Sequence, residues 1–389
     1  MKRVCHVITK LELGGAQEVA LRVVSSLDRT LFQPILISGP GGMLSDEARA
    51  LPGVDVRIVS SLVREINPLK DLRALVALVV AFRRLRPAIV HTHSSKAGII
   101  GRLAAWIAGV PAIVHTIHGY GITPLQSGWV RGLLIGLEWL IGRITTFWIA
   151  VSNADVQQGL RWRLFTSATV LLARPGIDPE PYTIRKDGAV RDRLRMEFGV
   201  DPSGILIGTV ACLKPQKAPE DFVKVAALIA REFPEARFLL AGDGELRDRV
   251  ERLVHESRLS DRFHLLGWRR DIPILMNALD VFVLTSRWEG LPCVLLEARA
   301  AAIPIVATNV GGAEEAIHEG IHGWLFPSGD TDGMARCICQ ILHGERRRVA
   351  DARPSVTFPK EFTIGETVRQ YQELYKQLLD HRHTPLHAR

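Results

Sequence analysis

The sequence predicts an α/β protein made of two doubly wound parallel-sheet domains, each of the Rossmann type. Short apolar strands alternate with helical segments along the whole chain, which is the order that a parallel sheet requires. Several strands, such as 280–286 (DVFVLTS), are apolar over most of their length, as strands covered on both faces are. A length of 389 residues also fits two domains better than one.

The first half opens with a strand at 4–9 and a loop that contains Gly14 and Gly15. A double glycine allows backbone to approach a ligand closely, although the dinucleotide fingerprint GxGxxG is absent. Further strands are expected at 34–38, 54–59, 88–92, 112–116, 147–151 and 167–172, and helices at 17–27, 69–85, 97–108 and 128–145. The irregular, proline-rich stretch 173–182 is the linker, so we place the first domain at residues 1–180.

The second domain, at residues 181–360, repeats the alternation. Strands are expected at 205–211, 237–241, 264–266, 280–286, 303–307 and 323–326, and helices at 219–232, 245–257, 272–278 and 330–343. A last helix at 361–380 is expected to cross back to the first domain, ahead of a disordered tail at 381–389. Ligands of such sheets bind at the carboxyl ends of the strands, so we expect the two halves to face a common cleft.

Composition and charge narrow the class of protein. The chain is 47% hydrophobic and 23% charged, as globular proteins are, and its five scattered cysteines fit a reducing cytoplasm. The apolar run in residues 1–9 is too short for a signal peptide, and we expect no membrane-spanning helix. Residues 1–185 carry a net charge of +9, whereas 186–389 carry −1. The basic half favours an anionic partner such as a membrane surface, a phosphorylated lipid or nucleic acid, or it is merely solvating.

The stretch 289–297 (EGLPCVLLE) is the strongest candidate site. It follows an apolar strand and contains a Gly-Leu-Pro turn, and Pro292 suits the first position of a helix. Free N–H groups and the helix dipole at that point form an anion site. Glu289 would then lie in the loop and Glu297 one to two turns into the helix. At these two positions the carboxylates suit the hydroxyl groups of a sugar and of a ribose. The alternative is an ordinary loop acid and helix acid.

Four histidines occupy the ends of predicted strands: His91, His93, His115 and His118. Their convergence favours a site over four separate structural roles. The His115-x-x-His118 spacing turns the two rings to opposite faces of a strand, so we expect no metal there.

Residues 128–143 (GWVRGLLIGLEWLIGR) form the most apolar predicted helix. Tryptophans and leucines with Arg131 and Arg143 are typical of an interfacial amphipathic helix. A core helix of the first domain is the alternative.

These features together resemble the retaining glycosyltransferases of family 4, which have the GT-B fold. The resemblance covers nearly the whole chain. It rests on Gly14-Gly15, His118, the Pro-Gly linker, Lys217 and above all the E-x7-E element from Glu289 to Glu297. The run 91–105 (HTHSSKAGIIGRLAA) resembles members that build exopolysaccharide, capsule or O-antigen.

The resemblance implies three catalytic residues, of which Lys217 neutralises the donor diphosphate, Glu289 contacts the donor sugar, and His118 binds the sugar near the reacting carbon. Glu297 would take the ribose hydroxyls. The other donor-site residues are Gly15, at which the first domain closes on the diphosphate, Cys212, Trp268 and Arg269 at the nucleobase, and Gly290, Leu291 and Pro292, whose backbone holds sugar and phosphate. His93 and Lys96 are assigned to the acceptor.

The implied reaction moves a sugar from a UDP-sugar to a lipid-linked or polysaccharide acceptor. No metal, other cofactor or nucleic acid partner is expected, and the protein would be cytoplasmic and peripheral on the inner face of the membrane. Cys212 and Ala218 replace the arginine and glycine that the family usually has near the phosphate lysine, and Arg174 replaces an asparagine before the Pro-Gly. Lys214 or Arg269 is a candidate to compensate for the missing arginine. Two alternatives share the fold, a nonhydrolysing sugar-nucleotide 2-epimerase and a catalytically silent sugar-nucleotide-binding homologue.

Overall fold

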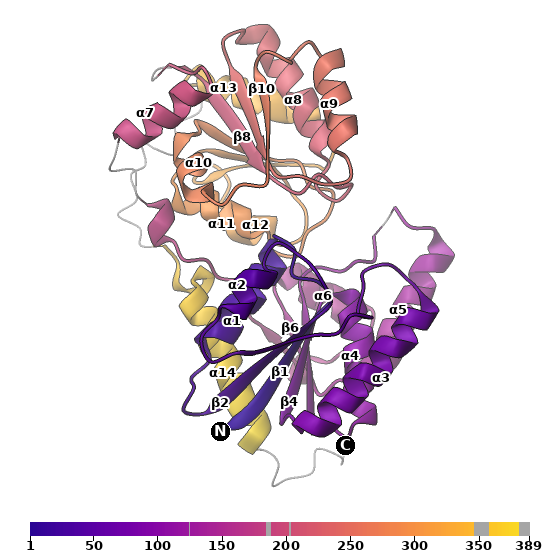
Figure 1. Ribbon diagram of the computed structural model, residues 1–389. Coiled ribbons are helices and arrows are strands. Elements are labelled where there is room, and N and C mark those ends of the chain that lie inside the picture. The colour runs from indigo at the N-terminus through magenta and orange to yellow at the C-terminus, as the bar shows by residue number, and fades with distance from the viewer. Residues whose placement is uncertain (124, 184–187, 202–203, 346–357, 381–389) are drawn as a thin grey trace. The chain divides into compact units, whose positions relative to one another are not determined.

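The computed structural model describes residues 1–389 except 124, 184–187, 202–203, 346–357 and 381–389 (Figure 1). The predicted tail 381–389 therefore lies outside the described residues. The chain divides into two compact units, which we call unit 1 (residues 1–176 and 360–389) and unit 2 (residues 177–359).

Unit 1 holds a seven-stranded parallel sheet in the order β3-β2-β1-β4-β5-β6-β7. Its strands are β1 (Lys2–Ile8), β2 (Phe32–Ser38), β3 (Asp55–Ile58), β4 (Ile89–His93), β5 (Ala112–Ile117), β6 (Phe147–Ala150) and β7 (Val170–Leu172). Its helices are α1 (Gly15–Ser26), α2 (Ser45–Arg49), α3 (Pro68–Leu85), α4 (Ser95–Ile107), α5 (Gly128–Gly142), α6 (Asn153–Arg161) and α14 (Ile364–Asp380).

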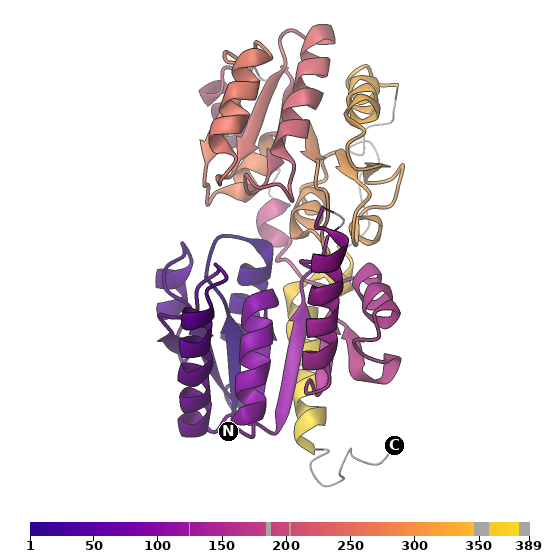
Figure 2. The same cartoon turned by 90° about the vertical axis from the view of Figure 1, so that its right-hand side faces the viewer.

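Helices cover both faces of this sheet, with α3 and α4 on one side and α1 and α14 on the other (Figures 1 and 2). Successive strand residues point to opposite faces. Cys5 and Val7 of β1 consequently join the apolar core under α3 and α4, whereas Ile8 packs with α1. His6 takes the same face as Ile8, and the parallel register places it beside His91 of β4. This register is what brings polar rings together inside unit 1.

Unit 2 holds a six-stranded parallel sheet in the order β10-β9-β8-β11-β12-β13. Its strands are β8 (Leu206–Val210), β9 (Arg237–Ala241), β10 (Phe263–Gly267), β11 (Val281–Leu284), β12 (Ile305–Thr308) and β13 (Gly323–Phe326). Its helices are α7 (Gly188–Glu197), α8 (Pro219–Glu232), α9 (Arg247–Glu256), α10 (Ile272–Ala278), α11 (Cys293–Ala300), α12 (Ala313–Ala316) and α13 (Thr331–Leu342). The central strands β8 and β11 are buried along almost their whole length, as the apolar run 280–286 predicted.

The terminal helix α14 returns to unit 1, as predicted. Its Thr367 hydroxyl donates to the carbonyl of Arg174 at 2.9 Å. Gly176 lets the linker approach the start of this segment, since a Cβ there would lie 2.2 Å from the carbonyl of Thr363. Tyr371 and Tyr375 are buried against the sheet, with the Tyr375 ring edge-on to Phe32 at 5.9 Å.

Three local predictions are wrong. Pro292 is the N-cap and not the first helical residue, because its backbone is extended (φ −73°, ψ 108°) and α11 begins at Cys293. Residues Ser167–Thr169 form a 3-10 turn, which a capping box between Thr166 and Thr169 closes, and only Val170–Leu172 is a strand. Helix α6 was missed although Ser152 caps it by accepting from the Asp155 N–H, a start signal visible in the sequence.

Candidate active site

A group of polar side chains lies in unit 2 where β11 ends and the loop 285–292 leads to α11. The Glu289 carboxylate is the centre of the group. It accepts a hydrogen bond from the Ser286 hydroxyl at 2.6 Å and one from the Gln216 amide at 3.3 Å. The Lys217 ammonium forms an ion pair with the same carboxylate. The side chains of Lys217 and Glu289 are only 17% and 7% exposed, so water screens this pair less than it would a surface pair.

Backbone contacts hold the two loops of this group together. The Arg287 N–H donates to the Gln216 carbonyl at 2.7 Å, and the Thr285 hydroxyl donates to the carbonyls of Lys217 and Ala218 at 3.1 and 3.0 Å. The loop that carries Lys217 is therefore fixed to the loop that carries Glu289. The structure brings these two predicted residues together although 72 positions separate them.

Gly311 and Gly312, which follow β12, pack against the backbone of the loop that carries Glu289. The Gly312 N–H donates to the Gly290 carbonyl at 2.6 Å. Gly311 has a φ of +57°, and a Cβ there would lie 2.3 Å from the Glu289 carbonyl oxygen. Glycine is required here on both counts, because other residues rarely adopt this φ and the space is filled by backbone.

The N-terminus of α11 follows directly. Pro292 caps the helix, and the Leu295 N–H bonds to the Pro292 carbonyl at 3.0 Å. The N–H groups of Cys293 and Val294 precede the first hydrogen bond within the helix, which is the arrangement that binds anions. Leu291 is buried, whereas Glu297 lies in the second turn and is half-buried.

The other predicted donor residues of unit 2 lie at the ends of β8 and β10. Cys212 is half-buried in the loop after β8. Trp268 is 37% exposed, and Arg269 is bound to Asp271 in its own loop by hydrogen bonds of 2.8 and 2.6 Å. The Asp271 carboxylate raises the pKa of Arg269. The Arg269 guanidinium is thus committed to Asp271, which weakens its candidacy as the substitute for the arginine that Cys212 replaces.

In unit 1, Gly15 is the first residue of α1. Lys96, predicted to meet the acceptor, is held by Asp71 of α3 at 2.6 Å and donates to the Glu65 carbonyl.

The predicted histidines of unit 1 separate onto two faces of the sheet. His115 packs against α4, where its Nδ1 bonds to the Thr92 hydroxyl at 2.8 Å. His91, His93 and His118 lie on the opposite face, where His93 Nδ1 is 3.1 Å from His118 Nε2. His93 is only 1% exposed, and His118 is half-buried at the end of β5.

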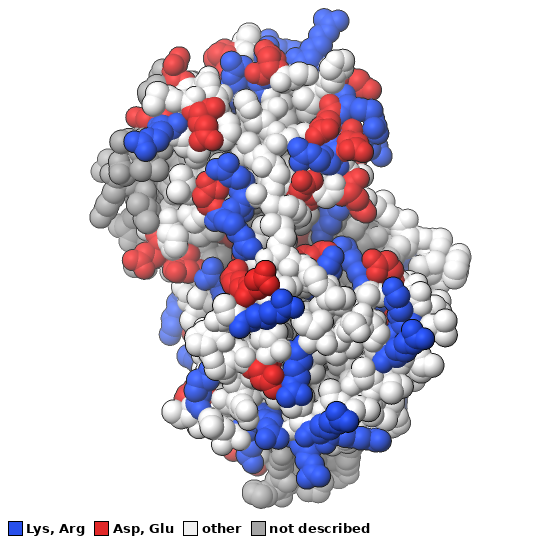
Figure 3. Space-filling view, in the orientation of Figure 1, with Lys and Arg blue, Asp and Glu red and all other residues white. Residues whose placement is uncertain are grey.

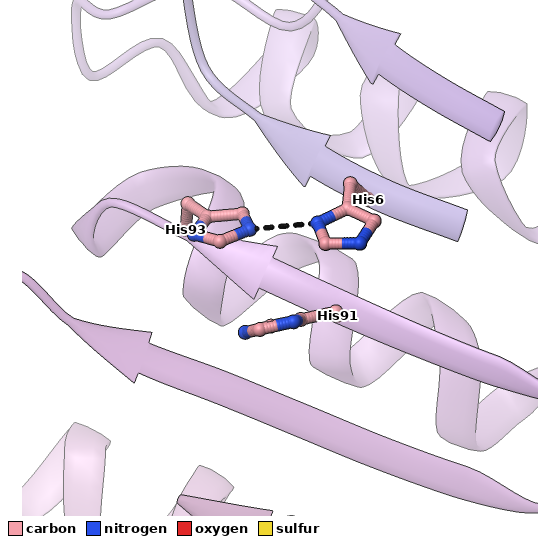
Figure 4. Close-up of side chains that lie close together, drawn as sticks. All are labelled: His6, His91 and His93. Carbon is pink, nitrogen blue, oxygen red and sulfur yellow. Dashed lines mark hydrogen bonds between the residues drawn. The ribbon is translucent and has the colours of Figure 1, made fainter. Parts of the chain in front are cut away.

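Sequence reasoning missed His6, which completes the group on this face (Figure 4). Its Nδ1 lies 3.0 Å from His93 Nε2. Two facts together indicate that His6 belongs to this group. The alternation along β1 gives the face on which His6 lies, and the pairing of β1 with β4 places it beside His91. The pairing follows only from the order of strands in the sheet. Burial lowers the pKa of His6 to about 3 and that of His118 to about 4, and places those of His91 and His93 well below 6.5. The four rings are therefore neutral at pH 7.

His6, His91 and His93 are also the candidate metal ligands among the described residues, because one nitrogen of each lies within 4.8 Å of the others. Each of these rings already bonds through both nitrogens to neighbouring side chains. A metal ion would have to break those bonds.

Comparisons with known proteins match both units. The family model "Glycosyltransferase Family 4" matches residues 13–181, and "Glycosyl transferases group 1" matches residues 190–353. The UDP-Gal:alpha-D-GlcNAc-diphosphoundecaprenol alpha-1,3-galactosyltransferase of Escherichia coli is 30% identical over 378 residues, which cover 96% of each chain. The N-acetyl-alpha-D-glucosaminyl L-malate synthase of Bacillus anthracis is 30% identical over 275 residues, which cover 69% of this chain and 68% of that one.

Solved structures agree on the fold. HepE of Anabaena in complex with UDP and glucose superposes with a TM-score of 0.82 at 20% identity and covers 97% of this chain and 100% of that one. Sucrose-phosphate synthase of Thermosynechococcus elongatus gives a TM-score of 0.79 at 18% identity, covering 98% and 100%. Two parallel-sheet units, both family models and a full-length relative lead to one conclusion. The chain belongs to the family 4 glycosyltransferases and has the GT-B fold.

Proposed function

We propose that this glycosyltransferase moves a sugar from a UDP-sugar to a lipid-linked acceptor at a membrane surface, with retention of configuration and without a metal ion. The observation that carries the proposal is the Lys217–Glu289 pair in front of the N-terminus of α11. The E. coli relative is named for a UDP-galactose donor and a diphosphoundecaprenol-linked acceptor, which supports both substrate classes.

The chemistry requires a group that accepts the charge of the leaving diphosphate. Glycosyl transfer passes through an oxocarbenium-like transition state, and negative charge grows on the phosphate as the bond to the sugar breaks. Stabilising that charge with preorganised donors is the largest help a protein gives to such a step. Here the donors would be the Lys217 ammonium and the N–H groups at the start of α11. In a retaining reaction the acceptor attacks the same face, and the leaving phosphate takes its proton.

Glu289 has a second part in this scheme. Its carboxylate neutralises Lys217 until a diphosphate arrives and then is available to accept hydrogen bonds from sugar hydroxyls. The carboxylate is held for this by Ser286 and Gln216.

The proposal needs no metal ion, because the Lys217 ammonium and the N–H groups at the start of α11 supply the positive charge. Transfer should therefore persist in the presence of EDTA. Loss of activity that Mg²⁺ or Mn²⁺ restores would contradict this part of the proposal.

The first prediction concerns Lys217. Lys217→Ala should lower kcat by about 100-fold or more, since it removes the main charge partner of the leaving group. The measurement is UDP release from UDP-sugars in the presence of a diphosphoundecaprenol-linked N-acetylglucosamine acceptor. Lys224→Ala is the matched control, because Lys224 is 56% exposed on α8 and pairs with Asp221 of the same helix. Near-wild-type kcat in Lys217→Ala would refute the site. UDP release without acceptor would favour hydrolysis, whereas conversion of one UDP-sugar into another without release of UDP would favour isomerisation.

The acceptor side of the proposal rests on α5. Ile141 alone of its described residues is buried, so the core-helix alternative is wrong. Trp129 and Leu133 are 75% and 64% exposed, and the Arg143 guanidinium lies 5.2 Å from the Trp139 ring. Figure 3 shows this uncharged surface at the edge of unit 1 with basic groups near it. Apolar side chains flanked by arginines suit the surface of an anionic membrane. Among the described helices, none has the length and apolar character needed to cross a bilayer.

The second prediction tests this surface. Trp129→Ser combined with Leu133→Ser should weaken co-sedimentation with anionic vesicles by about tenfold or more, because two apolar side chains no longer enter the bilayer. Ile321→Ser is the control, since Ile321 is 56% exposed and belongs to unit 2. Vesicles of zwitterionic lipid test the contribution of charge. Equal binding of the double variant and wild type would remove the membrane from the proposal.

A further inference from the structure

A run of hydrogen bonds crosses the interior of unit 1 from α14 to the end of β5. The Tyr375 hydroxyl lies 2.5 Å from His91 Nδ1 and 3.3 Å from His6 Nε2. His6 Nδ1 lies 3.0 Å from His93 Nε2, and His93 Nδ1 lies 3.1 Å from His118 Nε2. All of these residues except His118 are fully buried or 1% exposed. The run therefore connects a residue of the C-terminal helix to the predicted sugar-binding histidine.

Proton counting shows that these contacts depend on one another. A neutral imidazole has one N–H and one lone pair, and a nitrogen–nitrogen hydrogen bond holds one proton. The proton position on one ring therefore fixes the position on the next. Burial keeps the rings neutral, so an extra proton is not available to break the pattern.

Two arrangements satisfy every contact and also give the Tyr375 O–H proton an acceptor in the run. If Tyr375 donates to His91, it accepts from His6 Nε2–H. His6 Nδ1 then accepts from His93 Nε2–H, and His93 Nδ1 accepts from His118 Nε2–H. In the reverse arrangement all four rings carry the proton on Nδ1. In both arrangements His6, His91, His93 and His118 have the same tautomer.

Both nitrogens of His91 lie beside hydroxyl groups, Nδ1 at 2.5 Å from Tyr375 and Nε2 at 2.6 Å from Thr116. Whichever of the two hydroxyls donates to His91, the other rings follow through Tyr375. His118 Nδ1 therefore has one defined character, a lone pair in the first arrangement and an N–H in the reverse one.

We propose that Tyr375 is a positioning residue, which acts through His6 and His93 to hold His118 in a single tautomer and so fixes whether His118 Nδ1 accepts from, or donates to, a hydroxyl of the donor sugar. The sugar contact rests on the proposed function, whereas the tautomer does not. The proposal gives His93 a role inside unit 1 in place of the predicted contact with the acceptor. It also gives the returning helix α14 a part in substrate recognition.

The tautomers can be measured directly in the full-length wild-type chain. With ¹⁵N-labelled histidine, two-bond ¹H–¹⁵N correlations distinguish Nε2–H from Nδ1–H rings, and His118→Gln identifies the His118 signals by their loss. We expect one shared tautomer for His6, His91, His93 and His118 at pH 7. A mixed set of tautomers or a protonated ring in this group would overturn the proposal.

Tyr375→Phe tests the cause. It removes one hydroxyl and leaves the ring that packs on Phe32. His118 should then populate both tautomers, and transfer should slow by about tenfold, since one hydrogen bond sets the preference. The matched control is Thr92→Val on β4, which removes a buried hydroxyl from His115 on the opposite face of the sheet. His118 should be unchanged in that variant.

The outcomes separate the two proposals. A folded Tyr375→Phe protein, judged by its thermal unfolding, in which His118 keeps a single tautomer would overturn the role of Tyr375. A changed tautomer with unchanged transfer would confirm the control of the ring by Tyr375 and remove the sugar contact of His118. Loss of activity in Lys217→Ala with an intact histidine pattern would leave this inference independent of the diphosphate site.

Discussion

Lys217 and Glu289 neutralise each other in a place that water reaches poorly. A buried charge is stable only with a partner, so each of the two would be costly to leave alone. Under the proposed function, an incoming diphosphate would offer Lys217 a second anion. The pair would then be both a stabilising contact of the loop and a cation prepared for the substrate.

Gly311 is the residue on which the geometry of that pair depends most directly. Gly311→Ala should lower the free energy of unfolding by about 2 kcal/mol or more and reduce transfer, because the new methyl group must displace the Glu289 carbonyl. Urea unfolding and kcat are the measurements. Gly320→Ala is the control, since Gly320 also has a positive φ (+75°) but nothing lies within 4 Å of its Cβ position. Equal effects of the two substitutions would show that the positive φ alone causes the loss, and that the contact of the new methyl group with the Glu289 carbonyl does not contribute.

Among the secondary-structure elements, α14 has a first turn that depends on one carboxylate. Glu366 in this turn is 8% exposed and accepts hydrogen bonds from Arg369 at 2.8 Å and Gln370 at 3.0 Å. The bond from Arg369 is the main reason that the pKa of Glu366 falls from 4.5 to about 2. This first turn of the helix is thus held by a carboxylate that must stay ionised.

The pH dependence of that turn follows from the direction of the shift. A carboxylate with a lowered pKa in the folded state adds stability above its unfolded pKa of 4.5, and this is lost as pH falls through about 2. Glu366→Gln should therefore lower stability at pH 6 and flatten its dependence on pH between about 5 and 2. Urea unfolding across that range is the measurement. Glu373→Gln, at an exposed position of the same helix, is the control. The same slope in Glu366→Gln and wild type would contradict the assignment.

For the whole molecule, the two units differ in how they bury titratable groups. Unit 1 encloses His6, His91, His93 and His115 at 0 to 5% exposure. In unit 2, burial also lowers the pKa of His264 and that of His322, the latter to about 4, but both remain partly exposed. Protonation of the histidines should consequently affect unit 1 more than unit 2.

Acid should destabilise unit 1 first. The four buried rings are neutral when folded and take up protons below about pH 6.5 when unfolded, so the unfolded state binds more protons and stability falls as pH falls below 6.5. Each ring contributes a slope of up to about 1.4 kcal/mol per pH unit. Hydrogen exchange of β4 and β11, corrected for intrinsic rates, should show a larger loss of protection in β4 between pH 7 and 5. Equal losses in the two strands would be evidence against this difference.

Much of this protein was predictable from local patterns. The apolar runs and the helical periods predicted most strands and helices to within a few residues, and the E-x7-E element together with Lys217 indicated the family. The start of α11 was predicted one residue too early, because Pro292 has an extended backbone and caps the helix.

The sequence by itself determined the alternation of strands and helices, the presence of a last helix and the residue types of the donor site, because each depends on neighbours within a few turns of the chain. Only the tertiary structure decided that His6 lies beside His93, and that Tyr375 bonds to His91 across 284 positions. Those contacts depend on the order of strands in the sheet and on where α14 packs. Buried polar groups must find partners wherever the fold puts them, and no local pattern records which partners they find.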